Sequence, residues 1–466
     1  MSLKMTAALA ALLLSACAVG PRYEAPRTAP AEFRKAEPAA FTSAAAEARW
    51  WRQFGDPVLD ELVARALDGN LDLRIAQARV REARALLRDA RLDRLPRVTA
   101  AAAYQDGRTP QPAGPPLTDE TWEAGFDAAW ELDLFGRVRR SAEAAAADAG
   151  AAQADLRAAQ VTVAAEVART YLEFRGAQDR LAVALRNLDT QRETLRLTRT
   201  RLEVGSGDAV DVARAQGELS ATEATIPALI LEATTAAHRL AALTGERPGA
   251  LDGLLAGPRE VAARVRPLPI GEPGELLRRR PDVQAAERRL AGQAARVGVA
   301  TADLFPRVRI SGFLGFLTGD LGSLGDGASR AWSVAPTVTW PALDMAGARA
   351  RLRAQEARAD AALAAYDQAV LIALEDVENA FAGYAQQQAR LRSLTDREAA
   401  ARRAAELARL RYREGAVDFL TLLDAERSLL AAEDAASAAR TALNTRVVAV
   451  YKALGGGWEA AQAVAD

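Results

Sequence analysis

Two residue types that carry much of protein chemistry are almost absent from this chain of 466 residues. It has one cysteine, Cys17, and one histidine, His238. The cysteine count excludes disulfides within the chain and cysteine-based metal clusters. The histidine stands beside Arg239 in an Ala- and Leu-rich stretch, so we interpret it as a surface or interface residue and not as part of a catalytic triad. We therefore expect no metal site, no cofactor and no enzymatic activity.

Aromatic residues and net charge are also scarce. Aromatic side chains make up 5% of the chain, and 60 Lys and Arg nearly cancel 61 Asp and Glu. This balance gives no electrostatic reason to expect nucleic acid as a partner. Hydrophobic residues, by contrast, make up 50% of the chain. The abundance of Ala, Leu, Arg and Glu predicts long helices.

The N-terminus carries a targeting signal. Lys4 precedes an apolar stretch, Ala7 to Leu14, which is too short to span a bilayer as a mature helix. The stretch ends in Leu14-Ser15-Ala16-Cys17, which resembles a bacterial lipobox. We therefore expect Cys17 to carry a covalent lipid. Several acyl chains, each contributing about 0.8 kcal/mol per buried CH₂, would hold the protein firmly to a membrane. An ordinary secretory signal with an incidental cysteine is the alternative.

The chain repeats itself, and equivalent positions differ by 210 in sequence number. The matching pairs are Leu95-Pro96-Arg97-Val98 with Phe305-Pro306-Arg307-Val308, Trp122 with Trp332, Trp130 with Trp340, Gly205 with Gly415, and Asp208 with Asp418. One slip intervenes, because Leu132-Asp133 matches Leu343-Asp344 at an offset of 211. We infer a tandem duplication that joins in the Pro- and Gly-rich stretch from Pro267 to Pro273.

These features divide the chain into a signal peptide (1–16), a lipidated extended segment (17–50), repeat 1 (51–265) and repeat 2 (266–466). Each repeat is expected to run helix, strand, loop, strand, very long helix, tight turn, long helix. In repeat 1 we expect strands at about 97–106 and 121–131 and a helical hairpin at about 137–245. In repeat 2 we expect a helix at about 282–303, strands at about 307–317 and 331–340, and a hairpin at about 348–455.

Period-two alternation marks the strands. Between Trp122 and Trp130 one face is apolar and the other carries acidic residues, and the stretch from Trp332 to Trp340 alternates in the same way. Eight residues of tilted strand rise about 20 Å, the height of the apolar band of an outer-membrane barrel. We therefore interpret these four tryptophans as membrane-interface aromatics. A soluble sandwich with core tryptophans is the alternative.

The helices are much longer than globular helices. From about 137 to 202 there is no proline, so a helix of about 100 Å is expected. A coiled-coil seam is marked at intervals of seven by Phe174, Leu181, Leu188, Leu195 and Leu202. The hairpin tips are expected at Gly205, Gly207 and Asp208 in repeat 1 and at Gly415 and Asp418 in repeat 2, where glycine permits left-handed geometry and aspartate caps the return helix.

Four strands cannot close a membrane barrel, because single-chain barrels begin at eight strands. An open sheet would leave backbone groups at its edges unsatisfied in lipid. Several copies must therefore share one barrel, and geometry alone allows two, three or four.

Four motifs together resemble the outer-membrane efflux protein family, the TolC- and OprM-like channels, in its lipoprotein branch. They are Cys17-Ala18-Val19-Gly20-Pro21-Arg22-Tyr23, Trp51-Arg52-Gln53-Phe54-Gly55-Asp56-Pro57, Leu277-Arg278-Arg279-Arg280-Pro281-Asp282-Val283, and the stretch from Tyr412 to Arg427. The resemblance implies a fold that is mainly α with membrane β. It also implies a homotrimer with a 12-stranded outer-membrane β-barrel continuous with a 12-helix periplasmic α-barrel.

The resemblance also implies a periplasmic gate. Leu420 and Asp424 match the gate positions of the family and lie one helical turn apart. Threefold repetition would place a hydrophobic constriction above an acidic ring. Arg427, with Asp211 or Arg214 of repeat 1, would tie the closed state by ion pairs. Ordinary seam packing for Leu420 and solvated helix faces for the others are the alternative.

The function implied is passive conduction, as the exit duct of a tripartite efflux pump. The implied partners are a periplasmic adaptor, an inner-membrane transporter of the RND type and outer-membrane lipid. The alternatives are the periplasmic adaptor itself, which would have one hairpin flanked by β-rich domains, and a coiled-coil lipoprotein scaffold without a pore.

Overall fold

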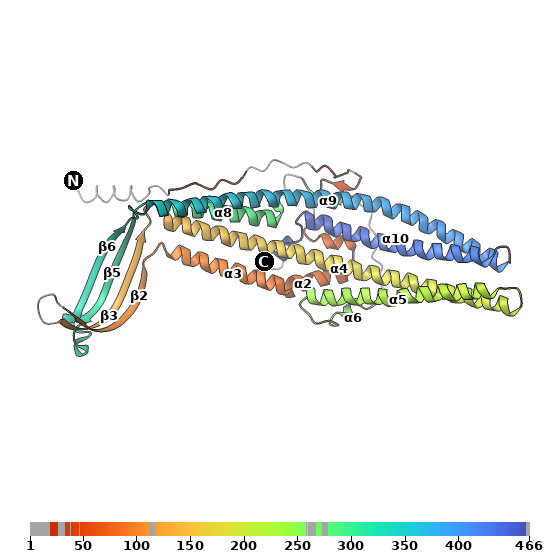
Figure 1. Cartoon of the computed structure of the whole chain (residues 1–466), viewed down its shortest axis with the longest axis horizontal. Helices are drawn as coiled ribbons and strands as arrows, with labels where there is room; N and C mark the ends of the chain where they lie inside the picture. The colour runs from red at the N-terminus through yellow and green to blue at the C-terminus, as the bar shows by residue number, and fades with distance from the viewer. Residues whose placement is uncertain are drawn as a thin grey trace. The chain divides into compact units, whose positions relative to one another are not determined.

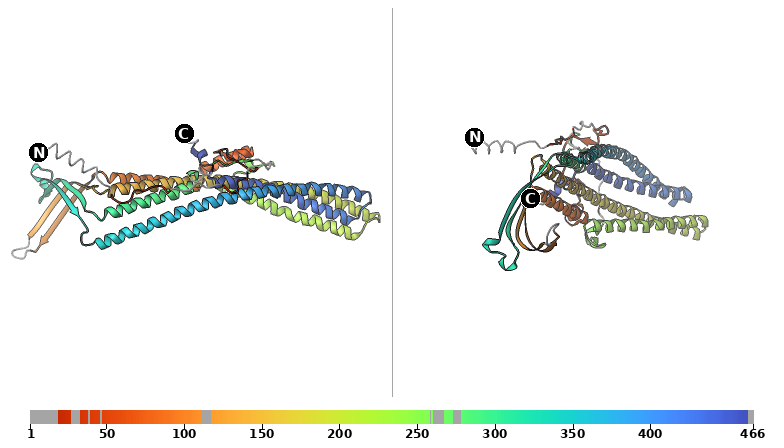
Figure 2. Two further views of the ribbon diagram at one scale, coloured as in Figure 1. Left: turned by 90° about the horizontal axis from the view of Figure 1, so that it is seen from above. Right: turned by 60° about the vertical axis from the view of Figure 1, so that its left-hand side comes forward.

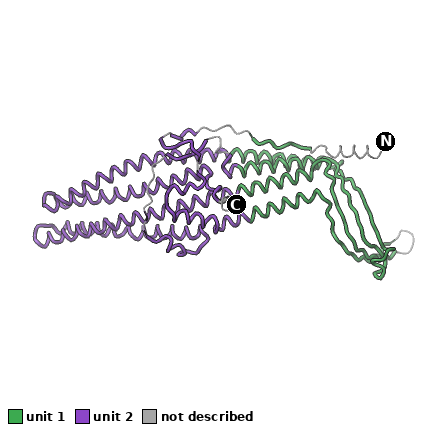
Figure 3. Tube along the Cα trace, turned by 180° about the vertical axis from the view of Figure 1, so that it is seen from behind, with its two compact units in different colours: residues 1–28, 78–154, 284–369 green, residues 29–77, 155–283, 370–466 purple. Residues whose placement is uncertain are grey.

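The structure, a computed structural model, describes residues 19–26, 33–37, 39–45, 47–110, 117–257, 259, 267–272 and 278–462. The expected signal peptide, 1–16, and the expected lipid site, Cys17, lie outside these residues. The chain forms two units (Figure 3). Unit 1 comprises residues 1–28, 78–154 and 284–369, and unit 2 comprises residues 29–77, 155–283 and 370–466.

Unit 1 contains an antiparallel four-stranded sheet in the order β2–β3–β5–β6 (Figure 1). Its strands are β2 (Arg97–Thr109), β3 (Leu117–Leu132), β5 (Arg307–Thr318) and β6 (Arg330–Thr339). Apolar side chains lie opposite one another across strands: Phe126 pairs with Leu314, and Leu314 pairs with Trp332. These side chains are 58%, 66% and 76% exposed. The described residues thus leave the apolar face of the sheet uncovered, unlike the inner face of a soluble sandwich.

The edges of this sheet are β2 and β6, each paired with a single strand in the described part of the chain. Pro336 lies in β6, opposite Ile310 of β5. Proline lacks a donor for a second neighbour, and an edge strand is where a sheet tolerates it. The β-hairpin formed by β2 and β3 is longer than expected, because the two strands pair as far as Thr109 opposite Leu117. Backbone hydrogen bonds continue the ladder beyond the apolar alternation from which we predicted the strand ends.

Equivalent tryptophans of the two repeats make equivalent hydrogen bonds. Trp130 Nε1 donates to the carbonyl of Arg94 at 3.0 Å, and Trp340 Nε1 donates to the carbonyl of Leu304 at 3.1 Å. Donor and acceptor are 36 residues apart in both pairs. The sequence offset therefore corresponds to a repeated local geometry.

Helices lead into and out of the sheet of unit 1. They are the end of α3 (Leu71–Leu92), most of α8 (Pro281–Ala302), and the beginnings of α4 (Arg137–Glu203) and α9 (Met345–Arg413). Gly136, at φ +84°, turns the chain from β3 into α4. The carboxylate of Asp133 accepts the free amides of Val138 and Arg139 at 2.9 Å each, which fixes where α4 begins.

Unit 2 is built around two helical hairpins, which lie side by side in Figure 2. The first joins α4 to α5 (Ala209–Leu243) and the second joins α9 to α10 (Phe419–Ala453). Their shared core near the tips consists of Leu188, Leu195, Ala215, Leu219, Ala408, Tyr412, Phe419, Leu422 and Leu423. Two of the expected seam leucines are thus in the core, whereas Leu202, beside the turn, is 39% exposed.

Shorter elements complete unit 2. They are β1 (Phe41–Thr42) paired with β4 (Leu268–Pro269), η1 (Trp50–Phe54), α2 (Pro57–Gly69), α6 (Asp252–Leu255) and α11 (Glu459–Gln462). Two further short helices, η2 (Leu321–Ser323) and η3 (Gly327–Ser329), belong to unit 1.

Arg280, just before α8, is buried and donates to the carbonyl of Ala453 at 2.9 Å. Its equivalent in repeat 1, Asn70, donates to the carbonyl of Leu243 at 2.8 Å. Among the described residues, no helix is both long enough and apolar enough to cross a membrane.

Candidate functional site

The predicted tip glycines and aspartates form the two turns of unit 2. Gly205 and Gly415 have φ of +76° and +74°, which ends α4 and α9 in left-handed geometry. Asp208 accepts the amide of Val210 at 2.8 Å and so caps α5. Asp418 caps α10 by accepting the amide of Thr421 at 2.8 Å and its hydroxyl at 2.6 Å. The Thr421 hydroxyl, followed by its amide, lowers the pKa of Asp418.

Leu420 and Asp424 lie one turn apart on the exposed side of α10. Leu420 is 51% exposed, although the neighbouring Phe419 and Leu422 are buried in the hairpin core. The side chain of Asp424 makes no hydrogen bond or ion pair within the described residues. Both side chains are therefore available to face whatever lies beside the hairpin.

The remaining gate candidates are held within the chain. Arg427 donates to Glu218 of α5 at 2.5 Å, so its partner is neither Asp211 nor Arg214. Those two residues lie 3.7 Å apart in an ion pair of their own on α5. Partial burial, then the charges of Asp208 and Asp418, raises the pKa of Asp211. Glu218, which joins the two hairpins just above their tips, was not predicted from the sequence.

Arg201 joins the tips by a different contact. Its Nη2 donates to the carbonyl of Tyr412 at 2.5 Å and to that of Arg413 at 3.3 Å, and its guanidinium lies 4.2 Å from the centre of the Tyr412 ring. Tyr412 and Arg413 are the last residues of α9, whose carbonyls have no partner within the helix. The cation of the first hairpin thus caps the second.

Polar layers cross the interface between the hairpins at intervals of seven residues. In one layer Thr194 Oγ1 donates to Glu426 at 3.1 Å, and Arg409 Nε donates to the same carboxylate at 2.8 Å. In the next layer, seven residues away along each helix, the partners are Asn187, Glu433 and Arg402. Asn187 reaches Glu433 at 2.9 Å, and Arg402 reaches it at 2.8 Å.

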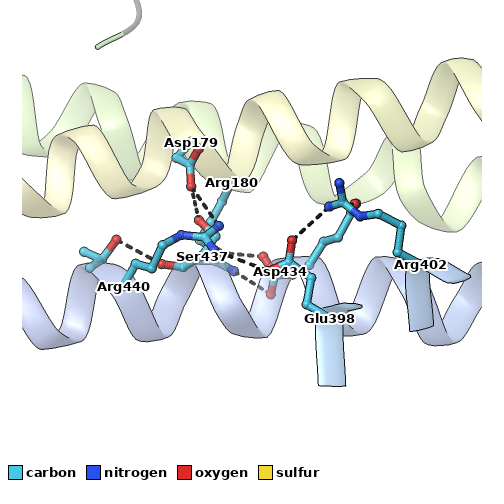
Figure 4. Close-up of polar contacts among 9 residues, drawn as sticks. Asp179, Arg180, Glu398, Arg402, Asp434, Ser437 and Arg440 are labelled. Carbon is cyan, nitrogen blue, oxygen red and sulfur yellow. Dashed lines mark hydrogen bonds and ion pairs between the residues drawn. The ribbon is translucent and has the colours of Figure 1, made fainter. Parts of the chain in front are cut away.

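Farther from the tips, ion pairs replace these buried layers (Figure 4). Arg180 of α4 donates to Asp434 of α10 at 2.7 Å, and Ser437 donates to Asp179 at 2.5 Å. Arg440 lies between Asp179, at 3.7 Å, and Glu398 of α9, at 3.3 Å. Three helices are thus tied together by charged groups at one level of unit 2.

Glu426 is the most deeply buried carboxylate of these layers, at 4% exposure. Its burial raises its pKa, and the charge of Arg409 and the bond from Thr194 offset part of that effect. The sequence does hold a signal for this layer, since Glu426 and Glu433 are seven residues apart, as are Thr194 and Asn187 and the pair Arg409 and Arg402. An apolar heptad pattern alone does not show it.

The four predicted interface tryptophans belong to unit 1 and to the sheet rather than to the tips. Trp332 and Trp340 are 76% and 55% exposed, while Trp122 and Trp130 are half-buried. The Trp122 ring packs on Tyr104 of the neighbouring strand, with 4.3 Å between ring centres. All four side chains follow the apolar face of the strands.

The model of the outer membrane efflux protein family matches residues 62–246 and 273–456. The chain belongs to the outer membrane efflux protein family. The starts of the two matched segments differ by 211 in sequence number (273 − 62) and their ends by 210 (456 − 246), in line with the internal repeat. Outer membrane efflux proteins are transport proteins, and this one is an outer-membrane channel, the exit duct of a tripartite efflux pump.

Similar proteins cover nearly the whole chain. Outer membrane protein OprJ of Pseudomonas aeruginosa is 34% identical, with 98% of this chain and 96% of OprJ aligned. The solved outer-membrane channel OprN is 50% identical, with a TM-score of 0.92 over 95% of this chain and 100% of that one. The Neisseria gonorrhoeae MtrE outer membrane channel, solved in its open state, is 31% identical, with a TM-score of 0.82 over 95% and 99%. The adaptor and scaffold alternatives are not favoured.

Proposed function

We propose that three copies of this chain form one duct, in which twelve strands close an outer-membrane β-barrel and twelve helices form a periplasmic tube. The observation that carries this proposal is the open four-stranded sheet with an exposed apolar face and two free edges, β2 and β6. Edges without partners are untenable in lipid, and pairing β6 of one copy with β2 of the next removes all of them. Three copies is the number that the family resemblance implies.

We propose further that Leu420 and Asp424 form the periplasmic gate. Both are exposed on one side of α10 near the tip, and three copies would repeat them around one axis. The leucines would narrow the passage and exclude water. The carboxylates would attract cations and repel one another when the passage is narrow. The bond from Arg427 to Glu218 supports the gate by fixing α10 against α5. Asp211 and Arg214 border the same tip on the first hairpin.

The proposed partners follow from this arrangement. A periplasmic adaptor and an inner-membrane transporter of the RND type would dock at the hairpin tips and draw the helices apart. A lipid on Cys17 would hold the duct to the outer membrane, as the lipobox-like sequence before that residue suggests. Conduction itself needs no energy from this chain.

Single-channel conductance in planar bilayers tests the pore and its gate together. We expect a small conductance for the purified wild type and a larger one for both Leu420→Ala and Asp424→Ala, because each removes a ring from the constriction. Leu371→Ala is the control for Leu420, since Leu371 is a leucine of α9 far from the tip and is 66% exposed. Asp396→Ala, an exposed carboxylate on α9, is the control for Asp424.

If neither gate variant conducts more than its control, the gate is placed wrongly. If an inserted, folded oligomer does not conduct in any variant, the protein is not the proposed pore.

A further inference from the structure

A cavity of about 470 Å³ lies in unit 2, where the end of α10 meets the start of α8. Its walls come from α4, α9 and α10, and Arg280 and Pro281 also line it. A cavity of this size can hold a small organic molecule. The residues that line it belong neither to the hairpin tips nor to the polar layers between the hairpins.

Arg280 occupies the carboxylates of this cavity. Its guanidinium donates to Asp282 at 2.6 Å and to Asp376 at 3.0 Å. It also donates to the carbonyls of Ala373 at 3.2 Å and Ala453 at 2.9 Å. Arg280 therefore has no donor left for a ligand, and both carboxylates that line the cavity already have a partner.

Three other polar side chains of the cavity are free to bind a ligand. They are the guanidinium of Arg446, the ammonium of Lys452 and the carboxamide of Asn379, and none of them makes a hydrogen bond or an ion pair within the described residues. The charge of Lys452 also acts on Glu166 of α4, but that carboxylate accepts a bond from Arg169 at 2.8 Å. With Arg280 included, the lining carries three cations against two carboxylates, so one positive charge is in excess.

A glycine of α9 makes room for Arg446. A Cβ at position 383, which is Gly383, would lie 3.3 Å from the nearest guanidinium nitrogen of Arg446 and 3.5 Å from its central carbon. Glycine is unfavourable in the interior of a helix. Its lack of a side chain here lets the guanidinium lie against α9 at the edge of the cavity.

The repeat offset shows that these cations are not needed to build a hairpin. At the equivalent positions of α5, Ala236 replaces Arg446 and Ala242 replaces Lys452, and both alanines lie within the continuous helix Ala209–Leu243. The two free cations are therefore a feature of the second hairpin and not of the repeated fold.

We propose that this cavity binds the carboxylate of an organic anion. The guanidinium of Arg446 offers two parallel donors to a carboxylate, and Lys452 and Asn379 supply further donors from α10 and α9. The apolar part of the anion packs on the aliphatic wall, which includes the buried Val161 and Ala380. The ligand class is thus a carboxylate with an apolar body.

The cavity lies on the side of α10 that faces away from the short elements of unit 2. Tyr451 stacks on Trp50 of η1, with 5.4 Å between ring centres. At about 100° per residue, Arg446 and Ala449 point roughly 140° and 160° away from Tyr451 around the helix. This step rests on the proposed function: a conducting ring keeps its interior open, so η1 lies outside and the cavity faces the passage. Anionic cargo then meets the site on its way out.

Binding of 2-naphthoate to the purified oligomer in detergent tests the site. A titration followed by saturation-transfer NMR should show saturable binding of 2-naphthoate, whereas the uncharged 2-naphthamide should not bind. Arg446→Gln and Lys452→Gln should each weaken binding about tenfold, because each removes a charged donor. Arg392→Gln is the matched control, since Arg392 is exposed on α9 outside the cavity and makes no side-chain hydrogen bond or ion pair in the described part of the chain.

The possible failures are distinguishable. If 2-naphthoate binds the Arg446→Gln and Lys452→Gln proteins as tightly as the Arg392→Gln protein, or if 2-naphthamide binds as well as the acid, the cavity is not the proposed anion site. If the oligomer conducts ions but does not bind 2-naphthoate, the site falls and the proposed duct stands. If it binds 2-naphthoate with the expected losses but conducts in no variant, the duct falls and the site stands.

Discussion

At the scale of single residues, Glu426 shows how a buried charge can define an interface. A carboxylate taken out of water loses hydration, and only well-placed donors compensate for the loss. Glu426 receives bonds from Thr194 and Arg409, from two different helices, while the nearby carboxylate of Glu218 opposes its ionisation. Its preferred partners thus exist only where both hairpins meet, which makes the contact specific for that register.

The raised pKa of Glu426 predicts a pH dependence of stability. A raised pKa means that the folded state holds the proton more tightly than the unfolded chain does. The stability that Glu426 contributes is therefore greatest below its ordinary value of 4.5 and falls as pH rises through the raised pKa. Glu426→Gln keeps an acceptor for Arg409 but cannot ionise, so its melting temperature relative to wild type should increase with pH.

Thermal unfolding of both proteins at several values between about pH 4 and pH 8 measures this difference. If the difference in melting temperature between the two proteins stays constant with pH, the protonation of Glu426 is not coupled to folding. Asp396→Asn is the control, because Asp396 is exposed on α9 and the same chemical change there removes no buried carboxylate.

At the scale of helices and strands, the sequence indicated most of the hairpins because long helices leave strong marks. The tip glycines and the seam leucines Leu188 and Leu195 take the places that their spacing predicted. Strand ends were less predictable, because a ladder can continue through polar residues, as it does to Thr109 and Leu117. The polar layers were missed because buried Thr, Asn and Glu look like surface residues in a sequence, and only the partner helix shows that they are buried.

The cap on α9 makes a prediction at this scale. Removing the guanidinium with Arg201→Ala leaves the Tyr412 carbonyl with only the amide of Gly415 as donor, deprives the Arg413 carbonyl of its side-chain donor, and removes the contact with the Tyr412 ring. Losses of about 1 kcal/mol are typical of helix-end charges and of cation–π contacts, and they correspond to about fivefold faster exchange. Hydrogen exchange in the last turn of α9 should accelerate by that factor.

Arg196→Ala is the matched control for the cap, since Arg196 is exposed and makes a 4.0 Å ion pair with Glu193 on its own helix. Equal acceleration in both variants would mean that Arg201 acts through α4 alone and does not cap α9.

At the scale of the whole molecule, the exposed apolar face of the sheet separates a protein of the membrane from a soluble one. Phe126 lies midway between Trp122 and Trp130, and Leu314 is its partner on the next strand. A cation there would sit near the bilayer midplane of the proposed barrel, where arginine costs about 2–4 kcal/mol. We expect Leu314→Arg to lower the temperature at which the native barrel unfolds on a gel.

Ser333→Arg is the control for that experiment, because Ser333 lies opposite Phe313 and so on the other face of the sheet. A cation on that face should be tolerated, since the proposed barrel is filled with water there. If both variants lose the same stability, the apolar face does not meet lipid.

The number of copies belongs to this scale too, and it is the property that one chain's sequence constrained least. The number of strands and the free sheet edges require more than one copy of the chain, but they allow a barrel of two, three or four copies. A hydrophobic pattern records which face of an element is covered and not which copy covers it.

The offset between the repeats also places Asp424 opposite Arg214 in the alignment of the two hairpins, since 424 − 210 = 214. A ring assembled from a gene with one repeat would carry the same residue at all six positions, so its mouth would hold six like charges. Fusing two copies of the gene lets the halves diverge, and in the proposed ring three Asp424 carboxylates would alternate with three Arg214 guanidinium groups. Duplication thus permits a charge pattern that identical subunits could not produce.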